Sequence, residues 1–212
     1  MPSENSTVTP PLLRPSVDPD AAVAALRQNL RKTRIAARER LPAAERAAFT
    51  RRIEDHLDRL LDELAPKTVA FCWPWRGEVD LVPWAQRWLA VDPARQMALP
   101  VVRTPGAPMV FLHWHPEVPM ETDHHGIPIP AGTEILQPEL ILVPLNVFDA
   151  AGYRLGYGGG YFDRTLAALQ PAPPCVGVAF ELARVDDTFP QPHDQPMDWI
   201  VTEAGAARAI SG

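Results

Sequence analysis

The stretch Arg154-Leu155-Gly156-Tyr157-Gly158-Gly159-Gly160-Tyr161-Phe162-Asp163-Arg164 carries the strongest signal in this chain. It follows the apolar run Leu140–Pro144, which predicts a buried strand, and precedes Thr165–Leu169, which predicts the start of a helix. Four glycines in five positions contribute no side-chain burial and cost backbone entropy. Their free N–H groups, next to a helix N-terminus, are suited to an anion such as phosphate. A plain glycine-rich turn between strand and helix is the alternative.

Length and composition are those of one globular domain. The chain has 212 residues, enough to bury a core, and 46% of them are hydrophobic. Proline accounts for 25 residues, roughly twice the usual share, which indicates long and stiffened connections. Cys72 and Cys175 each lie in an apolar run, which favours two buried, reduced thiols over a disulfide or a metal site.

Charge and targeting signals exclude several classes of partner. A net charge of −6 argues against nonspecific binding to nucleic acid or to a membrane surface. The sequence contains no apolar run of membrane-spanning length and no secretory signal, so we expect a cytoplasmic protein. A small-molecule ligand remains the expected partner, with the chain a monomer or a weak homodimer.

The order of elements predicts an α/β fold. Residues 1–17 are polar and without periodicity, so we expect a disordered tail, and we expect residues 18–212 to form a single domain. Two helices, at about 18–39 and 42–64, form an N-terminal helical extension and lead into strands that alternate with helices. The strands are continuous apolar blocks, which is typical of a largely parallel sheet covered on both faces, in an α/β/α arrangement.

The first helix carries a basic series. Arg27, Arg31, Arg34 and Arg38 are spaced four, three and four residues apart, so they share one helix face. Charge runs of this kind are usually solvated, and anion binding is the alternative.

Three acidic residues lie where chemistry is expected, beyond the carboxyl ends of the strands. Glu78 sits in a loop with two tryptophans, a setting suited to a flat, nitrogen-rich ring; an exposed loop glutamate is the alternative. Asp163 and Asp194 are candidate Mg²⁺ ligands near a bound phosphate. The first could equally be an ordinary helix N-terminal acid and the second a turn former. No histidine or cysteine spacing matches a closed zinc site.

These residues together resemble the 5-formyltetrahydrofolate cyclo-ligase family. The likeness spans roughly residues 22–203 and is most specific from Phe148 to Arg164, with support from Arg27–Arg31, Leu99-Pro100, Val176–Phe180 and Pro192–Asp194. It implies an ATP- and Mg²⁺-dependent conversion of 5-formyltetrahydrofolate to 5,10-methenyltetrahydrofolate, in which the formyl oxygen is phosphorylated and N10 closes the ring.

The resemblance also implies a set of site residues. ATP would be bound by Arg27, Arg31, Arg154, Leu155, Gly156, Tyr157, Gly158, Gly159, Gly160, Tyr161 and Phe162. The reduced folate would be bound by Trp73, Glu78, Tyr157, Gly158, Gly159, Gly160 and Tyr161. Arg154 and Tyr161 would be catalytic, and Asp163 and Asp194 would hold Mg²⁺.

Some positions depart from the family pattern. Arg27 replaces a common lysine, Leu145-Asn146 stands where a glycine commonly follows the proline, and Ile129 stands between two prolines where glutamate is typical. The last two departures favour an alternative in which the chain binds folate or nucleotide without turnover and serves regulation. A third possibility is a related enzyme acting on another phosphorylatable amide or a sugar phosphate.

Overall fold

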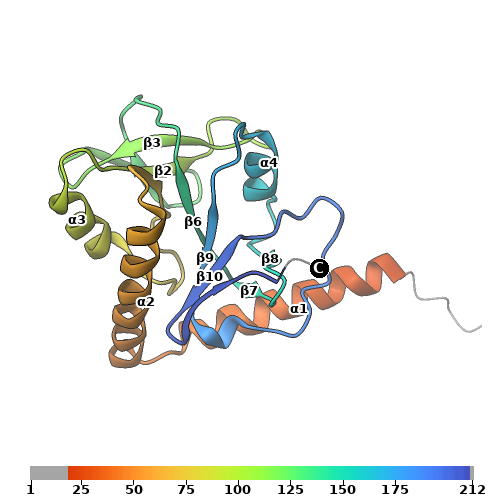
Figure 1. Cartoon of the computed structure of the whole chain (residues 1–212). Coiled ribbons are helices and arrows are strands. Elements are labelled where there is room, and N and C mark those ends of the chain that lie inside the picture. Colours follow the sequence, from red (N-terminus) through yellow and green to blue (C-terminus); the bar gives the residue numbers. More distant parts are fainter. Residues whose placement is uncertain (1–18, 211–212) are drawn as a thin grey trace, which may run out of the picture.

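A seven-stranded sheet forms the centre of the molecule (Figure 1). The structure, a computed structural model, describes residues 19–210, so the predicted tail 1–17 lies outside the described residues. In sheet order the strands are β11 (Gly205–Arg208), β10 (Trp199–Thr202), β9 (Cys175–Val178), β6 (Leu140–Pro144), β1 (Thr68–Ala70), β2 (Gln96–Val101) and β3 (Val110–Trp114).

The sheet is largely parallel, as predicted. The five strands from β10 to β2 run parallel, and the two edge strands, β11 and β3, are antiparallel to their neighbours. Ala70 of β1 lies between Ala98 of β2 and Ile141 of β6. The next strand in sequence, β2, lies on one side of β1 in the sheet, whereas β6, β9 and β10 lie on the other side of β1. The carboxyl ends of β1 and β6 therefore flank the switch point, where open α/β sheets bind ligands.

Helices cover both faces of the sheet, which gives the predicted three layers. Helices α2 (Ala43–Leu64) and α3 (Val82–Val91) pack on one face and α4 (Tyr161–Ala168) on the other (Figure 1). Alternate residues of β6 supply the two cores: Leu140 and Leu142 face α2 and α3, while Ile141 and Val143 face α4. The helix predicted at about 42–64 is confirmed, and its apolar side packs on the sheet, with Ile53, Leu57, Leu60 and Leu61 buried and Phe49 and Leu64 packed against the core.

The first helix, α1 (Pro19–Glu39), packs through its basic residues. It contacts β7 (Val147–Phe148) and the short helix η1 (Glu181–Ala183). Its buried side chains are Arg27, Ile35 and Arg38, whereas Leu26 is 47% exposed. The spacing of the basic series therefore indicated the face of α1 that packs against the rest of the protein. A fully solvated basic face is excluded, because Arg27 and Arg38 are buried.

Several element boundaries differ from the sequence-based predictions. Strand β1 ends at Ala70, before the proline of the following loop, and α4 begins at Tyr161 because the left-handed Gly160 (φ 64°) ends the glycine run. Strand β11 was not predicted from the sequence, and neither were two small antiparallel pairs, β4 (Met120–Thr122) with β5 (Pro128–Pro130) and β7 with β8 (Arg154–Leu155). Strands of two to four residues are too short to show periodicity.

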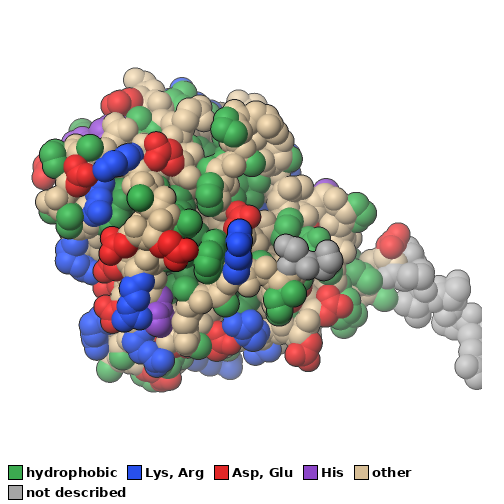
Figure 2. All heavy atoms as spheres, viewed as in Figure 1, with side chains coloured by type: hydrophobic (Ala, Val, Ile, Leu, Met, Phe, Trp, Pro, Cys, Tyr) green, Lys and Arg blue, Asp and Glu red, His purple; other side chains and the backbone are tan. Residues whose placement is uncertain are grey.

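The surface shown in Figure 2 carries interspersed basic and acidic side chains rather than one continuous basic patch. Across residues 19–210, none of the helices has both the length and the apolar character needed to cross a bilayer.

Candidate active site

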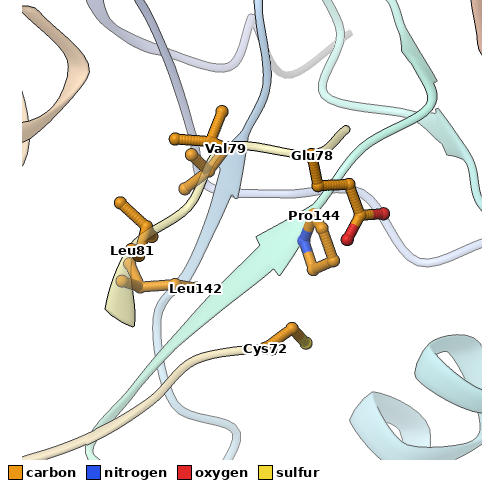
Figure 3. A pocket seen from close by; sticks show the side chains of 7 residues that line it. Cys72, Glu78, Val79, Leu81, Leu142 and Pro144 are labelled. Carbon is orange, nitrogen blue, oxygen red and sulfur yellow. The ribbon is translucent and has the colours of Figure 1, made fainter. Parts of the chain in front are cut away.

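The switch point between β1 and β6 contains a cavity lined by residues of three strand ends. Its lining consists of Cys72, Glu78, Val79, Leu81, Leu142, Pro144 and Val178. Glu78 is the charged member, and the other labelled side chains are aliphatic or a thiol (Figure 3). The Glu78 carboxylate is thus the charged group of a largely apolar cavity of about 20 Å³, which is room for about one water molecule.

Glu78 is buried, with 7% of its surface exposed, and its carboxylate accepts hydrogen bonds from two donors. The backbone N–H of Trp75 donates to Oε2 at 3.0 Å and the Tyr157 hydroxyl donates to Oε1 at 2.9 Å. The guanidinium of Arg38 lies 3.8 Å from Oε1. Burial raises the pKa of Glu78 above its ordinary value, and Arg38, Tyr157 and the Trp75 N–H only partly oppose that rise.

The glycine loop is held to the chain segment that follows β9. Arg154, 6% exposed, donates to Asp163 Oδ1 at 2.9 Å and also bonds the Gln195 carbonyl. The Gln195 N–H donates to the same Asp163 oxygen at 3.0 Å. Asp163 lies in the first turn of α4, directly after the glycines, where a carboxylate is favoured by the helix dipole. The ion pair between Arg154 and Asp163 therefore joins the two ends of the glycine loop.

Arg164 lies across the glycine run. Its Nη2 donates to the Gly159 carbonyl at 2.7 Å, and its guanidinium sits 4.9 Å from the centre of the Tyr161 ring. Both contacts place a cation and an aromatic ring beside the loop at the N-terminus of α4.

Two arginines of α1 reach the same region. Arg27 donates to Asp194 at 2.7 Å and 3.2 Å in a two-pronged ion pair, and Arg31 donates to the Gly156 carbonyl at 3.0 Å. Burial alone would raise the pKa of Asp194, but the hydrogen bonds from Arg27 and the Gln191 N–H outweigh it and hold that pKa below the ordinary value. Asp194 is therefore ionised and already neutralised by an arginine.

Known proteins resemble this chain over most of its length. Residues 23–203 match the 5-formyltetrahydrofolate cyclo-ligase family. The chain belongs to this family. A relative named 5-formyltetrahydrofolate cyclo-ligase from Haemophilus influenzae is 27% identical over 179 residues, which cover 81% of this chain and 94% of the relative. The relative of the same name from Escherichia coli K12 is 31% identical over 144 residues, covering 64% and 77%.

Solved structures show the same fold. The NMR structure of Aquifex aeolicus 5,10-methenyltetrahydrofolate synthetase has a TM-score of 0.76 at 31% identity, covering 88% of this chain and 94% of that one. The Mycoplasma pneumoniae 5,10-methenyltetrahydrofolate synthetase, at 24% identity, has a TM-score of 0.70 and covers 84% and 98%; at this identity it bears on the fold alone. The family assignment and the α/β fold expected from the sequence are confirmed.

The predicted cyclo-ligase site residues form two groups joined by one side chain. Arg27, Arg31, Arg154, Asp163 and Asp194 lie around the glycine loop, and Glu78 lies in the cavity. Tyr157 bridges the groups, because it belongs to the loop and donates to Glu78.

The remaining predicted residues are placed less directly. Trp73 is half-buried against the core. Leu155 is buried in β8, and the Phe162 side chain of α4 packs against the core, so Leu155 and Phe162 would contribute backbone atoms to a ligand site. Gly158 and Gly159 are exposed, and so is nearly half of Tyr157.

Two further residues of the candidate site were not predicted from the sequence. Arg38 donates to Asn146 Oδ1 at 2.8 Å and to the Tyr157 hydroxyl at 2.9 Å, which puts both beside Glu78. Arg38 belonged to the recognised basic series, and its spacing from Arg27 and Arg31 was the available signal. Asn146 was noticed as a departure from the family pattern, without a role.

Within residues 19–210, no three His, Cys, Asp or Glu side chains gather in a way that could hold a metal ion. A magnesium ion that binds together with nucleotide phosphates needs only one or two carboxylates, so the two candidate aspartates suit such an ion in number and in chemistry. Asp163 uses Oδ1 for both of its hydrogen bonds, from Arg154 and Gln195.

Proposed function

We propose that this protein converts 5-formyltetrahydrofolate to 5,10-methenyltetrahydrofolate in a reaction that consumes ATP. The observation that carries the proposal is the Tyr157 hydroxyl, 2.9 Å from Glu78. Through it the anion-binding glycine loop and the acidic cavity form one continuous site. A cyclo-ligase needs both, because the reaction brings a nucleotide phosphate to a formyl oxygen of the folate.

The chemistry explains why a phosphate site adjoins a ring-binding site. A formyl amide is a poor electrophile and its oxygen is a poor leaving group. Phosphorylation of that oxygen forms an O–P bond and releases ADP; N10 then attacks the formyl carbon, and inorganic phosphate leaves with the oxygen. There is little for side chains to do beyond holding the partners and stabilising charge.

We assign ATP binding to the arginines around the loop. Arg27 and Arg31 approach from α1, and Arg154 approaches from β8. These cations pair with carboxylate or carbonyl oxygens in the structure, which supports the proposal that an oxyanion binds here. The backbone of Gly156–Gly160 would supply N–H groups to the phosphates. Asp163 and Asp194 would hold Mg²⁺, which supplies charge neutralisation at the phosphates.

We assign the folate to the cavity side. Glu78 would accept hydrogen bonds from the N–H groups of the pterin ring, with Trp73 and Tyr161 beside the substrate. Tyr161 lies at the start of α4, next to the glycines, and Arg154 lies at the base of the loop. These two would stand where phosphoryl transfer takes place, and we propose them as the catalytic residues.

One assay tests the proposal. The purified protein is mixed with 5-formyltetrahydrofolate, ATP and Mg²⁺, and the near-ultraviolet absorbance of the methenyl product is followed, with ATP omitted as the control. We expect product only when ATP and Mg²⁺ are both present. Absence of product from protein that binds the folate by calorimetry would overturn the enzymatic proposal.

The alternative of a binding protein without turnover rests on Ile129 and on Leu145-Asn146. Leu145 and Asn146 are both buried, and the Asn146 side chain belongs to the hydrogen-bond network around Glu78. Ile129 lies in β5, paired with Glu121 of β4. Binding of folate and ATP with no formation of methenyl product would favour this alternative.

A further inference from the structure

We propose that Arg38 is a positioning residue of the folate half of the site, which fixes the direction and the negative charge of the Glu78 carboxylate. The inference deepens the proposed function and rests on it for the identity of the ligand. Arg38 belongs to α1, and its side chain is 5% exposed, so it is one of the most completely buried charges around the cavity.

Arg38 connects α1 to three segments that lie far apart in the sequence. Its Nε donates to the Arg76 carbonyl at 3.2 Å, its Nη1 to Asn146 Oδ1 at 2.8 Å and its Nη2 to the Tyr157 hydroxyl at 2.9 Å. These partners lie in the loop after β1, the turn after β6 and the glycine loop. A planar guanidinium has donors in a fixed fork, so one side chain sets the relative orientation of all three segments.

The arrangement also fixes where the Tyr157 proton points. Arginine can only donate, so the Tyr157 oxygen accepts from Arg38 and its proton must go to Glu78 Oε1. Glu78 therefore receives one donor on each carboxylate oxygen, from Tyr157 and from the Trp75 N–H. Each oxygen can accept a second hydrogen bond, which leaves acceptor capacity on the cavity side for ligand N–H groups.

Asn146 gives an independent sign that the cluster is built for a ligand. Because Arg38 is donor-only, the amide of Asn146 must turn its oxygen to Arg38 and its nitrogen away. That nitrogen is buried and has no hydrogen-bond partner among the described residues. A buried donor without a partner costs stability, and a ligand acceptor beside it would recover that cost.

The charged and titratable groups that face Glu78 are Arg38 of α1, Tyr157 of the glycine loop and Cys72 after β1. Arg46 of α2 lies against the neighbouring Gly77. Burial raises the pKa of Glu78, and Arg38 is the largest of the opposing influences. Loss of the Arg38 charge therefore favours protonation of Glu78, in which state it presents one acceptor fewer to the folate.

The test compares Arg38→Gln and Arg38→Lys with Arg40→Gln, a matched control at the exposed position two residues further on. The pKa of Glu78 is measured in ligand-free protein by carbon NMR of the glutamate carboxyl groups, with Glu78→Gln used to assign the signal. The second measurement is the pH profile of kcat/KM for 5-formyltetrahydrofolate at saturating Mg²⁺-ATP.

We expect Arg38→Gln to raise the Glu78 pKa by about one unit or more and to move the acid limb of the profile upward by the same amount. The kcat/KM at neutral pH should fall on the order of tenfold to a hundredfold. Arg38→Lys retains the charge but not the fork, so it should leave the pKa near the wild-type value while raising KM for the folate. The control should match wild type in both measurements.

An unchanged Glu78 pKa in folded Arg38→Gln protein would overturn the inference. If that variant does not fold, Arg38→Lys decides: unaltered KM for the folate would refute a positioning role. The NMR titration needs no turnover, so it separates the two proposals. An inactive wild type with the expected pKa response would refute the cyclo-ligase activity and leave the Arg38–Glu78 relationship standing.

Discussion

Arg27 and Asp194 form a buried ion pair across 167 residues of sequence, with Nη1 and Oδ2 2.7 Å apart. The arginine is our candidate phosphate ligand and the aspartate our candidate Mg²⁺ ligand. In the structure each is the partner of the other, so the charges of these two candidate ligands neutralise one another. The same ion pair links α1, which contains Arg27, to the segment before β10, which contains Asp194.

Removing one member of this pair should be costly. Asp194→Ala leaves the buried Arg27 without its counter-charge, and we expect a loss of about 3 kcal/mol in the free energy of unfolding in urea at neutral pH. The double variant Arg27→Ala/Asp194→Ala should lose less than the sum of the single variants, because no unpaired charge remains. Strict additivity would mean that the two side chains do not stabilise one another in solution.

The lowered pKa of Asp194 adds a pH dependence to this stabilisation. Its contribution is present above the ordinary aspartate pKa and is lost as the pH falls through the lowered value. Asp194→Asn protein should lack that part of the acid-induced loss. Parallel stability curves for wild type and variant over the acidic range would contradict this.

Glu78 should show the opposite dependence. Its pKa is raised, so its contribution to stability is greatest below the ordinary glutamate value and declines as the pH rises through the raised value. Relative to wild type, Glu78→Gln should therefore gain in unfolding free energy as the pH rises from the ordinary glutamate pKa through the raised pKa of Glu78. The same variant should bind the folate more weakly at neutral pH, as measured by calorimetry. A stability difference that does not vary with pH would show that Glu78 titrates normally.

Asp163→Asn should weaken the binding of Mg²⁺-ATP without weakening the binding of the folate. The amide can keep an oxygen toward Arg154 and Gln195, as Asp163 does, but it is a weaker ligand for Mg²⁺. We expect KM for Mg²⁺-ATP to rise on the order of tenfold or more while the dissociation constant of the folate changes little. Equal losses of both affinities would refute the assignment of Asp163 to the metal.

Two glycines of the loop provide a matched pair. A Cβ at Gly156 would meet nothing within 4 Å, whereas Gly160 has φ +64° and a Cβ there would lie 2.8 Å from Arg164 Nη1. Gly160→Ala should therefore cost about 1–2 kcal/mol of stability. Gly156→Ala should fold as wild type does and lose affinity for ATP, because its Cβ projects into space that we assign to the phosphates. Wild-type ATP affinity in Gly156→Ala would exclude close approach of a phosphate at that residue.

The central strands could be predicted because each is a continuous apolar block. Leu140–Pro144 was predicted with the bounds that the structure shows. Strands β7 and β8 could not be found this way, since each has two residues and is defined by its partner rather than by its own sequence. Their pairing is nonetheless what brings the glycine loop back toward β6.

The residues of the candidate site could largely be predicted from the sequence, whereas the hydrogen bonds between them could not. Glu78, the arginines and the two aspartates could be singled out, because residues of these types are hard to explain by packing. The role of Arg38 could not, since its partners lie 38, 108 and 119 residues further along the chain. The same holds for the buried amide of Asn146, whose surroundings exist only after folding.

Tyr157 gives the two half-sites a thermodynamic connection. Its backbone belongs to the loop that we assign to the nucleotide, and its hydroxyl supplies one of the hydrogen bonds that Glu78 accepts. Any ligand that displaces the loop therefore changes the strength of that hydrogen bond, and any ligand that engages Glu78 alters the free energy of moving the loop. Such coupling is reciprocal, so the factor by which ATP changes the affinity for folate must equal the factor by which folate changes the affinity for ATP. Tyr157→Phe would uncouple the two affinities while leaving both pockets in place.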